Sequence, residues 1–327
     1  MGIHQEIDSN PNSQSYSCIK KLDNNYDLSY DTLKKEIKKS IKYIEKHKKN
    51  KNFSYNKNIQ KEYNLLLNTI DKDFKHFDNL IRGFNQLCRY KDVKAYKYNY
   101  IEINTEQKFI NSSPVNIIND KYIIATQGPK SNTIEDFWTM IDQYDCHIIV
   151  MLCSLIEENK EKCSCYWDIN NNMEKYKIND IKEEEKKFDK SFVIIRKISL
   201  FNKIQKVEKI ITQLHFTQWP DYGALIVNDI FDVFQFMIEE IDKLKDKTPG
   251  IVHCSAGVGR TGSFISIYFL FKEIMAQIKD NNLVKINFSV FNMVRKLKEM
   301  RLFMVQNFQQ YKFIYDFVNL LLIKYNQ

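Results

Sequence analysis

HCSAGVGRTG, residues 253–262, gathers one cysteine, one arginine and three glycines in a 327-residue chain that has only eight glycines. The apolar stretch GIVHC, residues 250–254, predicts a β-strand before it, and TGSFISIYFLFKEI, residues 261–274, predicts a helix that begins within it. In a glycine-bearing turn from a strand into a helix, successive backbone N–H groups point inward and form an anion-binding nest at the positive helix end. The stretch therefore predicts an α/β fold with an oxyanion site at this turn.

Cys254 and Arg260 are the reactive and the charged side chain of this turn. The nest favours a thiolate at Cys254, and Arg260 can hold two oxygens of a tetrahedral oxyanion bidentately. A lone buried cysteine is more often an inert small hydrophobe. The strand, glycine turn and helix around this one instead indicate a nucleophile in a phosphate-binding cup. A Walker-type nucleotide loop is excluded here, because no Gly-Lys-Ser/Thr sequence is present.

Two further residues have more than one interpretation. His253, taken alone, is as readily a hydrogen-bonded core residue as a group that orients the loop next to Cys254. Asp221 lies in WPDYG, residues 219–223, where a lone aspartate is ordinarily a turn residue. Cleavage of a phosphate ester by a cysteine also needs a proton for the leaving oxygen. The two motifs together therefore indicate a nucleophile with its general acid.

At this point the sequence resembles the tyrosine-specific protein phosphatases over roughly residues 53–325. Widely spaced motifs agree in order; besides the two above they are CRYKDV at 88–93, YIIATQGP at 122–129, TIEDFWTMI at 133–141, EKCSCYW at 161–167 and MVQNFQQYKFIY at 304–315. The resemblance implies an α/β (α+β) fold: one large domain with a central twisted mixed sheet flanked by helices. It also implies hydrolysis of phosphotyrosine in proteins or peptides, without a metal or another cofactor.

The resemblance implies a role for each matched residue. Cys254 forms a phosphocysteine intermediate, Arg260 binds the phosphoryl group, and Asp221 is first the general acid and then the general base. The implied catalytic residues are Cys254, Arg260, Asp221, Gln306, Thr261 and His253. The implied substrate-binding residues are Ser255, Ala256, Gly257, Val258, Gly259, Arg260, Tyr90, Asp92, Lys162, Gln310 and Phe303.

Within these sets, Gln306 and Gln310 match the glutamines that position the hydrolytic water, and Thr261 matches a hydroxyl that helps the thiolate leave. Tyr90 matches the ring that stacks on phosphotyrosine and sets the pocket depth, and Asp92 matches the carboxylate that binds substrate N–H groups.

Three more positions follow from the same match. Glu157 and Lys162 match the partners of Arg260 and of the loop that carries Asp221. Phe303 falls where some members have a small residue that opens a second phosphate-binding groove; here it either narrows the rim or packs in the core.

The sequence departs from the family pattern at several positions that supply no catalytic atoms. They are Ala95, Lys97 and Tyr100 after CRYKDV, Ala224 and Leu225 after WPDYG, Tyr268 in the helix after the phosphate loop, and Asn307 beside Gln306. These changes put local packing and loop closure in question. Because the cysteine, the arginine and the aspartate are all present, activity is favoured over a domain that only binds and protects phosphotyrosine.

The first 52 residues form a polar, basic extension to a catalytic domain at 53–327, with eleven lysines against seven acidic residues. Leu33, Ile37, Ile41 and Ile44 have helical spacing and predict an amphipathic helix at about 31–49. Such a helix could cap the domain or stay in solvent, and membrane binding is the less favoured alternative.

Composition narrows the remaining possibilities. The net charge is +8, but the basic residues lack the interleaved aromatic side chains that single strands need, so we expect no nucleic-acid partner. The polar N-terminus and the absence of an apolar run of about 20 residues argue against a signal peptide and a membrane span. Seven cysteines without a regular framework predict reduced thiols and a cytoplasmic location. Cys163 and Cys165 lack a second ligand pair for zinc.

Local patterns predict the order of the elements beyond residue 90. Strands are predicted at 121–127, 146–152, 191–200 and 210–218, and helices at 133–144, 227–244, 261–279 and 288–301. A further helix is predicted at 59–70.

Overall fold

The computed structural model describes residues 53–73, 80–118, 121–219, 225–245, 247–279 and 286–325. The predicted helix at 31–49 and the predicted general acid Asp221 lie outside the described residues. The chain divides into two compact units, Met1–Glu62 and Tyr63–Gln327. Every strand, and every helix from residue 131 onwards, belongs to the second unit.

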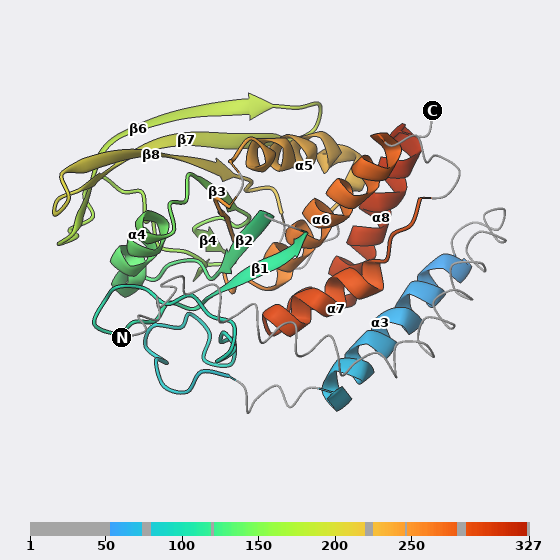
Figure 1. Cartoon of the computed structure of the whole chain (residues 1–327). Helices are drawn as coiled ribbons and strands as arrows, with labels where there is room; N and C mark the ends of the chain where they lie inside the picture. Colours follow the sequence, from blue (N-terminus) through green and yellow to red (C-terminus); the bar gives the residue numbers. More distant parts are fainter. Residues whose placement is uncertain are drawn as a thin grey trace, which may run out of the picture. The chain divides into compact units, whose positions relative to one another are not determined.

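A seven-stranded mixed sheet forms the centre of the second unit, in the order β1-β2-β9-β3-β8-β7-β6 (Figure 1). Its strands are β1 Ser112–Ile118, β2 Lys121–Thr126, β3 Ile148–Met151, β6 Tyr176–Lys187, β7 Phe192–Asn202, β8 Val207–His215 and β9 Gly250–His253. A separate hairpin pairs β4 Ile156–Glu157 with β5 Lys160–Glu161.

The four middle strands β2, β9, β3 and β8 run parallel, so their carboxyl ends meet at one edge of the sheet. His253, the last residue of β9, lies in register between Thr126 of β2 and Met151 of β3. All residues of β3 and β9 are buried, which explains why both strands read as continuous apolar runs. The loops after β2, β3, β8 and β9 therefore meet around Cys254.

Within the described residues, the helices are α3 Phe53–Asp73, the 3₁₀ turn η2 Ser131–Thr133, α4 Ile134–Gln143, α5 Val227–Asp242, α6 Gly259–Lys279, α7 Val290–Met300 and α8 Phe308–Tyr325. Helix α6 packs against α7 and α8, and α5 packs against α8 (Figure 1). Residues 259–271 of α6 are all buried, so this part of the helix is enclosed on every side rather than on one face only.

The structure confirms the predicted fold class and most predicted elements. The predicted strands correspond to β2, β3, β7, β8 and β9, and the predicted helices correspond to α3, α4, α5, α6 and α7. The sequence patterns do not predict strands β1 and β6, nor helix α8, which begins within the 304–315 motif. Strand β6 was not predicted because it is an edge strand whose second half is exposed. Its IKEEEKK stretch therefore lacks the alternation of apolar residues that indicates a strand.

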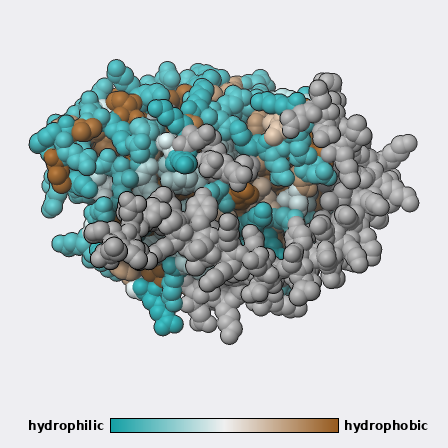
Figure 2. Space-filling model, in the orientation of Figure 1, coloured by the Kyte–Doolittle hydropathy of each residue, from teal (hydrophilic) through white to brown (hydrophobic). Residues whose placement is uncertain are grey.

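On the face shown in Figure 2, the described surface is mostly hydrophilic, and apolar residues occur in small separate groups. No helix in the described part of the chain combines the length and the apolar character needed to cross a bilayer.

Candidate active site

The turn between β9 and α6, residues 254–259 and called here the phosphate loop, requires glycine where it bends. Gly257 has a φ of +71°, and a Cβ there would lie 2.1 Å from the carbonyl oxygen of Thr126. Both the left-handed backbone and the close approach exclude a side chain. Cys254 follows β9 directly and is 4% exposed. The predicted strand–turn–helix setting of the cysteine is therefore present.

Arg301 supports the phosphate loop from behind, a role that the sequence did not reveal. Its Nε donates to the Gly257 carbonyl at 2.9 Å and its Nη2 to the Ala256 carbonyl at 3.3 Å. Since a trans peptide points C=O and N–H in opposite directions, the next two N–H groups, of Gly257 and Val258, point away from Arg301. Burial lowers the pKa of this fully buried guanidinium to about 10. The loop amides are thus fixed toward a single side.

Arg260 is aligned by a carboxylate. Its Nη1 and Nη2 donate to Oε1 and Oε2 of Glu157, each at 2.7 Å, and Nη1 also donates to the Trp219 carbonyl at 3.2 Å. Burial alone would lower the pKa of Arg260, but its hydrogen bonds and ion pair with the Glu157 carboxylate raise it above the ordinary value. The side chain is therefore a fixed cation, 5% exposed, at the first turn of α6.

His253 is fully buried, and its ring contacts the loop and the core. Nδ1 lies 3.1 Å from the Cys254 carbonyl oxygen, and Nε2 lies 3.0 Å from the hydroxyl of Tyr166. Burial lowers the pKa of His253 to about 3, so the imidazole is neutral at physiological pH. His253 is therefore a hydrogen-bonded core residue that contacts the loop, and its role in orienting the loop stays a prediction.

Gln306 and Gln310 lie over the start of α6. A Cβ on Gly259 would lie 2.7 Å from Nε2 of Gln310 and 3.3 Å from Oε1 of Gln306. The Gln310 Oε1 accepts from the Gln306 backbone N–H at 2.8 Å. Asn307 caps α8 through its Oδ1, which accepts from the Gln310 N–H at 2.9 Å. The departure at Asn307 therefore serves to position one of the two glutamines.

The hydroxyl of Thr261 is buried in the first turn of α6 and has no hydrogen-bond partner within the described part of the chain. A buried hydroxyl without a partner is costly. This is consistent with an intermittent partner at the predicted site.

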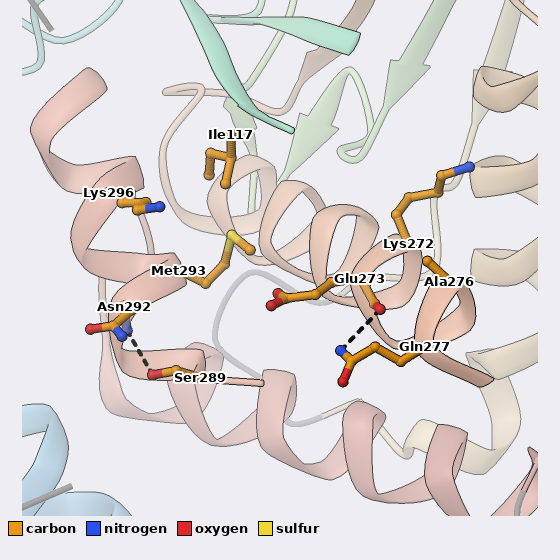
Figure 3. A pocket seen from close by; sticks show the side chains of 9 residues that line it. All are labelled: Ile117, Lys272, Glu273, Ala276, Gln277, Ser289, Asn292, Met293 and Lys296. Atoms are coloured by element: carbon orange, nitrogen blue, oxygen red, sulfur yellow. Dashed lines mark hydrogen bonds between the residues drawn. The ribbon is translucent and has the colours of Figure 1, made fainter. Parts of the chain in front are cut away.

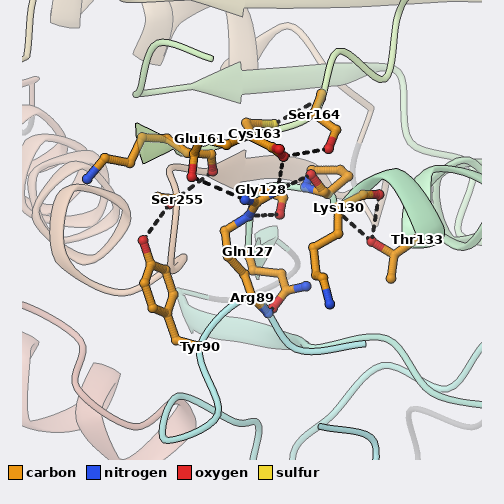
Figure 4. Close-up of polar contacts among 12 residues, drawn as sticks. Arg89, Tyr90, Gln127, Gly128, Lys130, Thr133, Glu161, Cys163, Ser164 and Ser255 are labelled. Carbon is orange, nitrogen blue, oxygen red and sulfur yellow. Dashed lines mark hydrogen bonds and ion pairs between the residues drawn. The ribbon is translucent and has the colours of Figure 1, made fainter. Parts of the chain in front are cut away.

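The side chain of Tyr90 points toward Ser255 of the phosphate loop (Figure 4). Its hydroxyl is 3.0 Å from Oγ of Ser255, which itself donates to the Lys162 carbonyl at 2.9 Å. The preceding Arg89, to which the sequence assigned no role, donates to the carbonyls of Gly128 at 2.9 Å and of Pro129 at 2.5 Å. Tyr90 is thus a 37% exposed ring on an anchored backbone.

Three other predicted residues lie around this rim in different settings. Asp92 is exposed, in a turn closed by the Val93 N–H to the Tyr90 carbonyl at 3.2 Å. Lys162 is 7% exposed, with its Nζ 4.0 Å from Oε2 of Glu157. Phe303 is partly buried against the cluster of Leu80, Tyr96 and Leu302, and its φ is +63°. Packing of Phe303 is therefore observed, and its effect on the rim stays a prediction.

The departures from the family pattern that the structure describes lie in different local settings. Tyr268 donates to Oδ1 of Asp242 at 3.0 Å from inside α6. Ala95 is fully buried, and its carbonyl accepts from the Ile81 N–H at 3.2 Å. Tyr100 is partly buried and Lys97 is exposed. Leu225 is partly buried, whereas Ala224 lies outside the described residues.

The cavity between α6 and α7 contains none of the predicted site residues. Its volume is about 590 Å³, and Glu273, Met293 and Lys296 are among its walls (Figure 3). Within the described ranges, no group of three or more histidine, cysteine or acidic side chains is placed to hold a metal ion. Cys163 and Cys165 are free thiols.

Comparisons with known proteins identify the family that this chain resembles. A family model described as "Protein-tyrosine phosphatase" matches residues 85–319. Tyrosine-protein phosphatase non-receptor type 20 of Rattus norvegicus is 32% identical over 234 residues, which cover 70% of this chain and 53% of the relative. Receptor-type tyrosine-protein phosphatase eta of Mus musculus is 32% identical over 239 residues, covering 71% of this chain and 18% of the relative.

Among solved structures, the catalytic domain of human protein tyrosine phosphatase non-receptor type 18 superposes with a TM-score of 0.69 at 25% identity, covering 80% of this chain and 95% of that one. The chain spans about half the length of the non-receptor type 20 relatives it matches.

Proposed function

The chain belongs to the protein-tyrosine phosphatase family, and we propose that it hydrolyses phosphotyrosine in proteins through a phosphocysteine intermediate on Cys254. One observation carries the proposal: a buried cysteine at the end of β9 begins a loop whose amides are aimed to one side by Arg301 and closed by Arg260. Such preorganised donors stabilise the charge that develops on a transferring phosphoryl group.

In the first step, Cys254 Sγ attacks phosphorus and the bond from phosphorus to the tyrosyl oxygen breaks. Arg260 and the loop amides bind the equatorial oxygens, and Glu157 keeps the guanidinium in the required plane. Asp221 donates a proton to the tyrosyl oxygen, because an expelled phenolate is a poor leaving group without one.

In the second step, water attacks the phosphocysteine and the sulfur–phosphorus bond breaks. Gln306 and Gln310, which lie over Gly259, position this water, and Asp221 accepts its proton. The buried hydroxyl of Thr261 donates to the departing thiolate, which supplies the partner it otherwise lacks in the described structure. The enzyme returns to its starting state with phosphate in the loop.

Substrate choice follows from reach. We propose that Tyr90, whose hydroxyl lies 3.0 Å from Oγ of Ser255, forms one wall of the substrate cleft and makes it as deep as a phenyl ring is long. A phosphoserine side chain is too short to bring its phosphorus to Cys254 at the bottom of such a cleft. Asp92, exposed in the same turn, is placed to accept from backbone N–H groups of a bound peptide.

We further propose that residues 53–327 are the catalytic domain, that residues 1–52 are an extension to it, and that the protein acts in the cytoplasm on phosphotyrosine proteins. The non-receptor names of several relatives support this location, although other relatives are receptor-type.

The test is hydrolysis of a phosphotyrosine peptide by the whole chain and by Cys254→Ser. The variant should lose turnover but still bind the peptide, because the nest and Arg260 remain. Cys165→Ser, which changes a partly exposed thiol outside the phosphate loop, is the matched control and should keep full activity. Turnover by Cys254→Ser near the parent rate would contradict the covalent mechanism, and loss of activity in EDTA would point to a metal phosphatase.

A further inference from the structure

An unbroken series of hydrogen bonds crosses the sheet from its edge strand to the phosphate loop. Glu183 of β6, Arg196 of β7 and Gln213 of β8 are cross-strand neighbours in one row. The row continues through Tyr166 to His253, whose ring contacts the Cys254 carbonyl. Only Glu183, with 54% of its side chain exposed, opens to solvent.

The direction of every bond in this series follows from Arg196, because a guanidinium can only donate. Its Nη1 donates to Oε1 of Gln213 at 2.8 Å, so the Gln213 amide turns its nitrogen toward Tyr166, 2.6 Å away. The Tyr166 oxygen therefore accepts from Gln213 and uses its one proton toward Nε2 of His253, at 3.0 Å.

The alternative acceptor for that proton is weak. The sulfur of Met151 lies 3.8 Å from the Tyr166 hydroxyl, and a thioether is a poorer acceptor than an imidazole nitrogen. With Nε2 of His253 accepting, Nδ1 must carry the proton of the neutral ring, and it donates to the Cys254 carbonyl at 3.1 Å.

A second series of hydrogen bonds leads from the Arg196 guanidinium to His215 and selects the opposite tautomer there. Nη1 of Arg196 also lies 3.0 Å from Nδ1 of His215, which must accept, so Nε2 carries the proton of that ring. This Nε2 donates to the Cys153 carbonyl at 2.8 Å. One arginine nitrogen, with two hydrogens, thus imposes opposite tautomers on two buried histidines.

Arg196 is itself held in place. Its Nε donates to Oε2 of Glu183 at 2.6 Å, and its guanidinium lies 4.6 Å from the ring centroid of Trp167. The surroundings of His253 leave little other control over its protons: the ring is fully buried and packs edge-on against Phe137 and Tyr166. The charged or titratable groups that act on it are His215 and Arg89, besides the Cys254 carbonyl it contacts.

We infer that Arg196 and Gln213 are positioning residues for the phosphate loop, because they set the tautomer of His253 and so fix the peptide between Cys254 and Ser255. With its carbonyl held by His253, that peptide turns the Ser255 N–H to the opposite side, which is the side of the anion. In the other tautomer, a lone pair on Nδ1 would face the carbonyl oxygen and repel it. The catalytic consequence rests on the proposed function, whereas the tautomer does not.

The test is Gln213→Glu, a change that keeps the shape of the side chain but removes its only donor. Arg196 keeps the new carboxylate ionised, so Tyr166 must donate to it and can only accept from His253. We expect the His253 proton to move from Nδ1 to Nε2, as read from ¹⁵N shifts and long-range ¹H–¹⁵N couplings of the ring. On phosphotyrosine peptide, kcat/KM should fall by about tenfold to a hundredfold, as for loss of a hydrogen bond to a buried group.

Two controls separate this effect from simple damage. Gln205→Glu adds the same charge at an exposed turn before β8 and should leave both the tautomer and the activity unchanged. Arg196→Lys keeps a donor-only cation and should retain the Nδ1–H form of His253.

The unmodified protein provides the decisive spectrum even if Gln213→Glu does not fold. It should show Nδ1–H for His253 together with Nε2–H for His215. Nε2–H at His253 in the parent, or an unchanged tautomer in a folded Gln213→Glu, would overturn the inference, whatever the activity proves to be.

Discussion

The phosphate loop and the loop that carries Tyr90 meet at Ser255, yet they are held in different ways. The phosphate loop is fixed by buried groups: Arg301 is fully buried and binds two loop carbonyls, and His253 is fully buried beside a third. The Tyr90 loop is anchored by its backbone neighbour Arg89, while Tyr90 itself stays 37% exposed.

This difference bears on where the sequence of the chain departs from the family pattern. All the departures from the family pattern before strand β1 follow the Tyr90 loop, at Ala95, Lys97 and Tyr100, and none falls inside the phosphate loop. An exposed ring on an anchored backbone can change its surroundings without moving the reacting atoms. A loop whose carbonyls are bound by buried side chains cannot, because each lost bond leaves a buried group without a partner.

The largest effect should come from removing the support behind the phosphate loop. Arg301→Met leaves the carbonyls of Ala256 and Gly257 without a donor, so we expect unfolding free energy to fall by about 3 kcal/mol and kcat/KM by about 10²-fold or more. Urea denaturation and peptide hydrolysis measure the two effects. Arg82→Met, at an exposed position, is the control and should change neither. An active, stable Arg301→Met would break the distinction between the two loops.

The general acid should matter nearly as much without touching stability. Asp221→Ala should lower kcat by about 10²-fold, the usual contribution of a positioned acid, and should remove the alkaline limb of the pH profile. Asp189→Ala, at an exposed position on the β6–β7 turn, should leave the profile intact. An unchanged alkaline limb in Asp221→Ala would assign the proton to another group.

Low pH should reduce the stability of the folded protein through the two buried histidines, His253 and His215. Burial lowers the pKa of His253 to about 3 and of His215 to about 4, below the ordinary value of about 6.5. Between these values the unfolded chain binds a proton that the native state does not, so stability is complete above pH 6.5 and is lost as pH falls. Each histidine contributes a slope of about 1.4 kcal/mol per pH unit.

Two carboxyls, Asp136 and Glu273, oppose this trend because burial raises the pKa of each, and a variant isolates the histidine. Burial raises the pKa of Asp136 to about 6, so between about pH 4 and 6 its contribution favours the folded state as pH falls. His253→Gln should therefore reduce the stability lost between pH 6.5 and pH 5 by about 2 kcal/mol, measured by urea denaturation at both pH values. An equal loss in parent and variant would show that His253 is already charged in the native state.

The smallest effect is expected at the rim. Phe303→Gly removes packing against Leu80, Tyr96 and Leu302 but also relieves a positive φ, two changes of opposite sign and each of about 1 kcal/mol. Stability should change little. In the parent, a peptide with two adjacent phosphotyrosines should have kcat/KM within about threefold of the singly phosphorylated one, a difference of well under 1 kcal/mol.

The gain from the second phosphate should be larger in Phe303→Gly. A strong preference for the doubly phosphorylated peptide in the parent would show that Phe303 does not narrow the rim.

The same contrast explains what could be predicted from the sequence. The phosphate loop could be predicted from the sequence because its chemistry is local. Glycines, Cys254 and Arg260 lie within one turn between an apolar strand and an apolar helix. Glu157 and the two glutamines could be predicted only from the family resemblance, since they are distant in sequence from the phosphate loop.

The side chains that support the phosphate loop could not be predicted from the sequence. Arg301 and Arg196 are buried arginines, and nothing in their neighbouring residues distinguishes them from exposed ones. Gln213 and Tyr166 act through bonds that exist only once folding brings strand β8 and the segment after β5 close to His253 at the end of β9. The polar edge strand β6 was missed for a related reason, because it is specified by pairing with β7 rather than by its own pattern.

The covalent intermediate on Cys254 is the most direct test of the account. Parent protein and Gln306→Ala, in which the second step should be slower, are mixed with phosphotyrosine peptide, quenched in acid within milliseconds and digested for mass spectrometry. We expect a phosphoryl group on the peptide that contains Cys254, at higher occupancy in Gln306→Ala, with tyrosine peptide released before phosphate. A phosphoryl group on another residue, or simultaneous release of both products with Cys254 unmodified in both proteins, would contradict it.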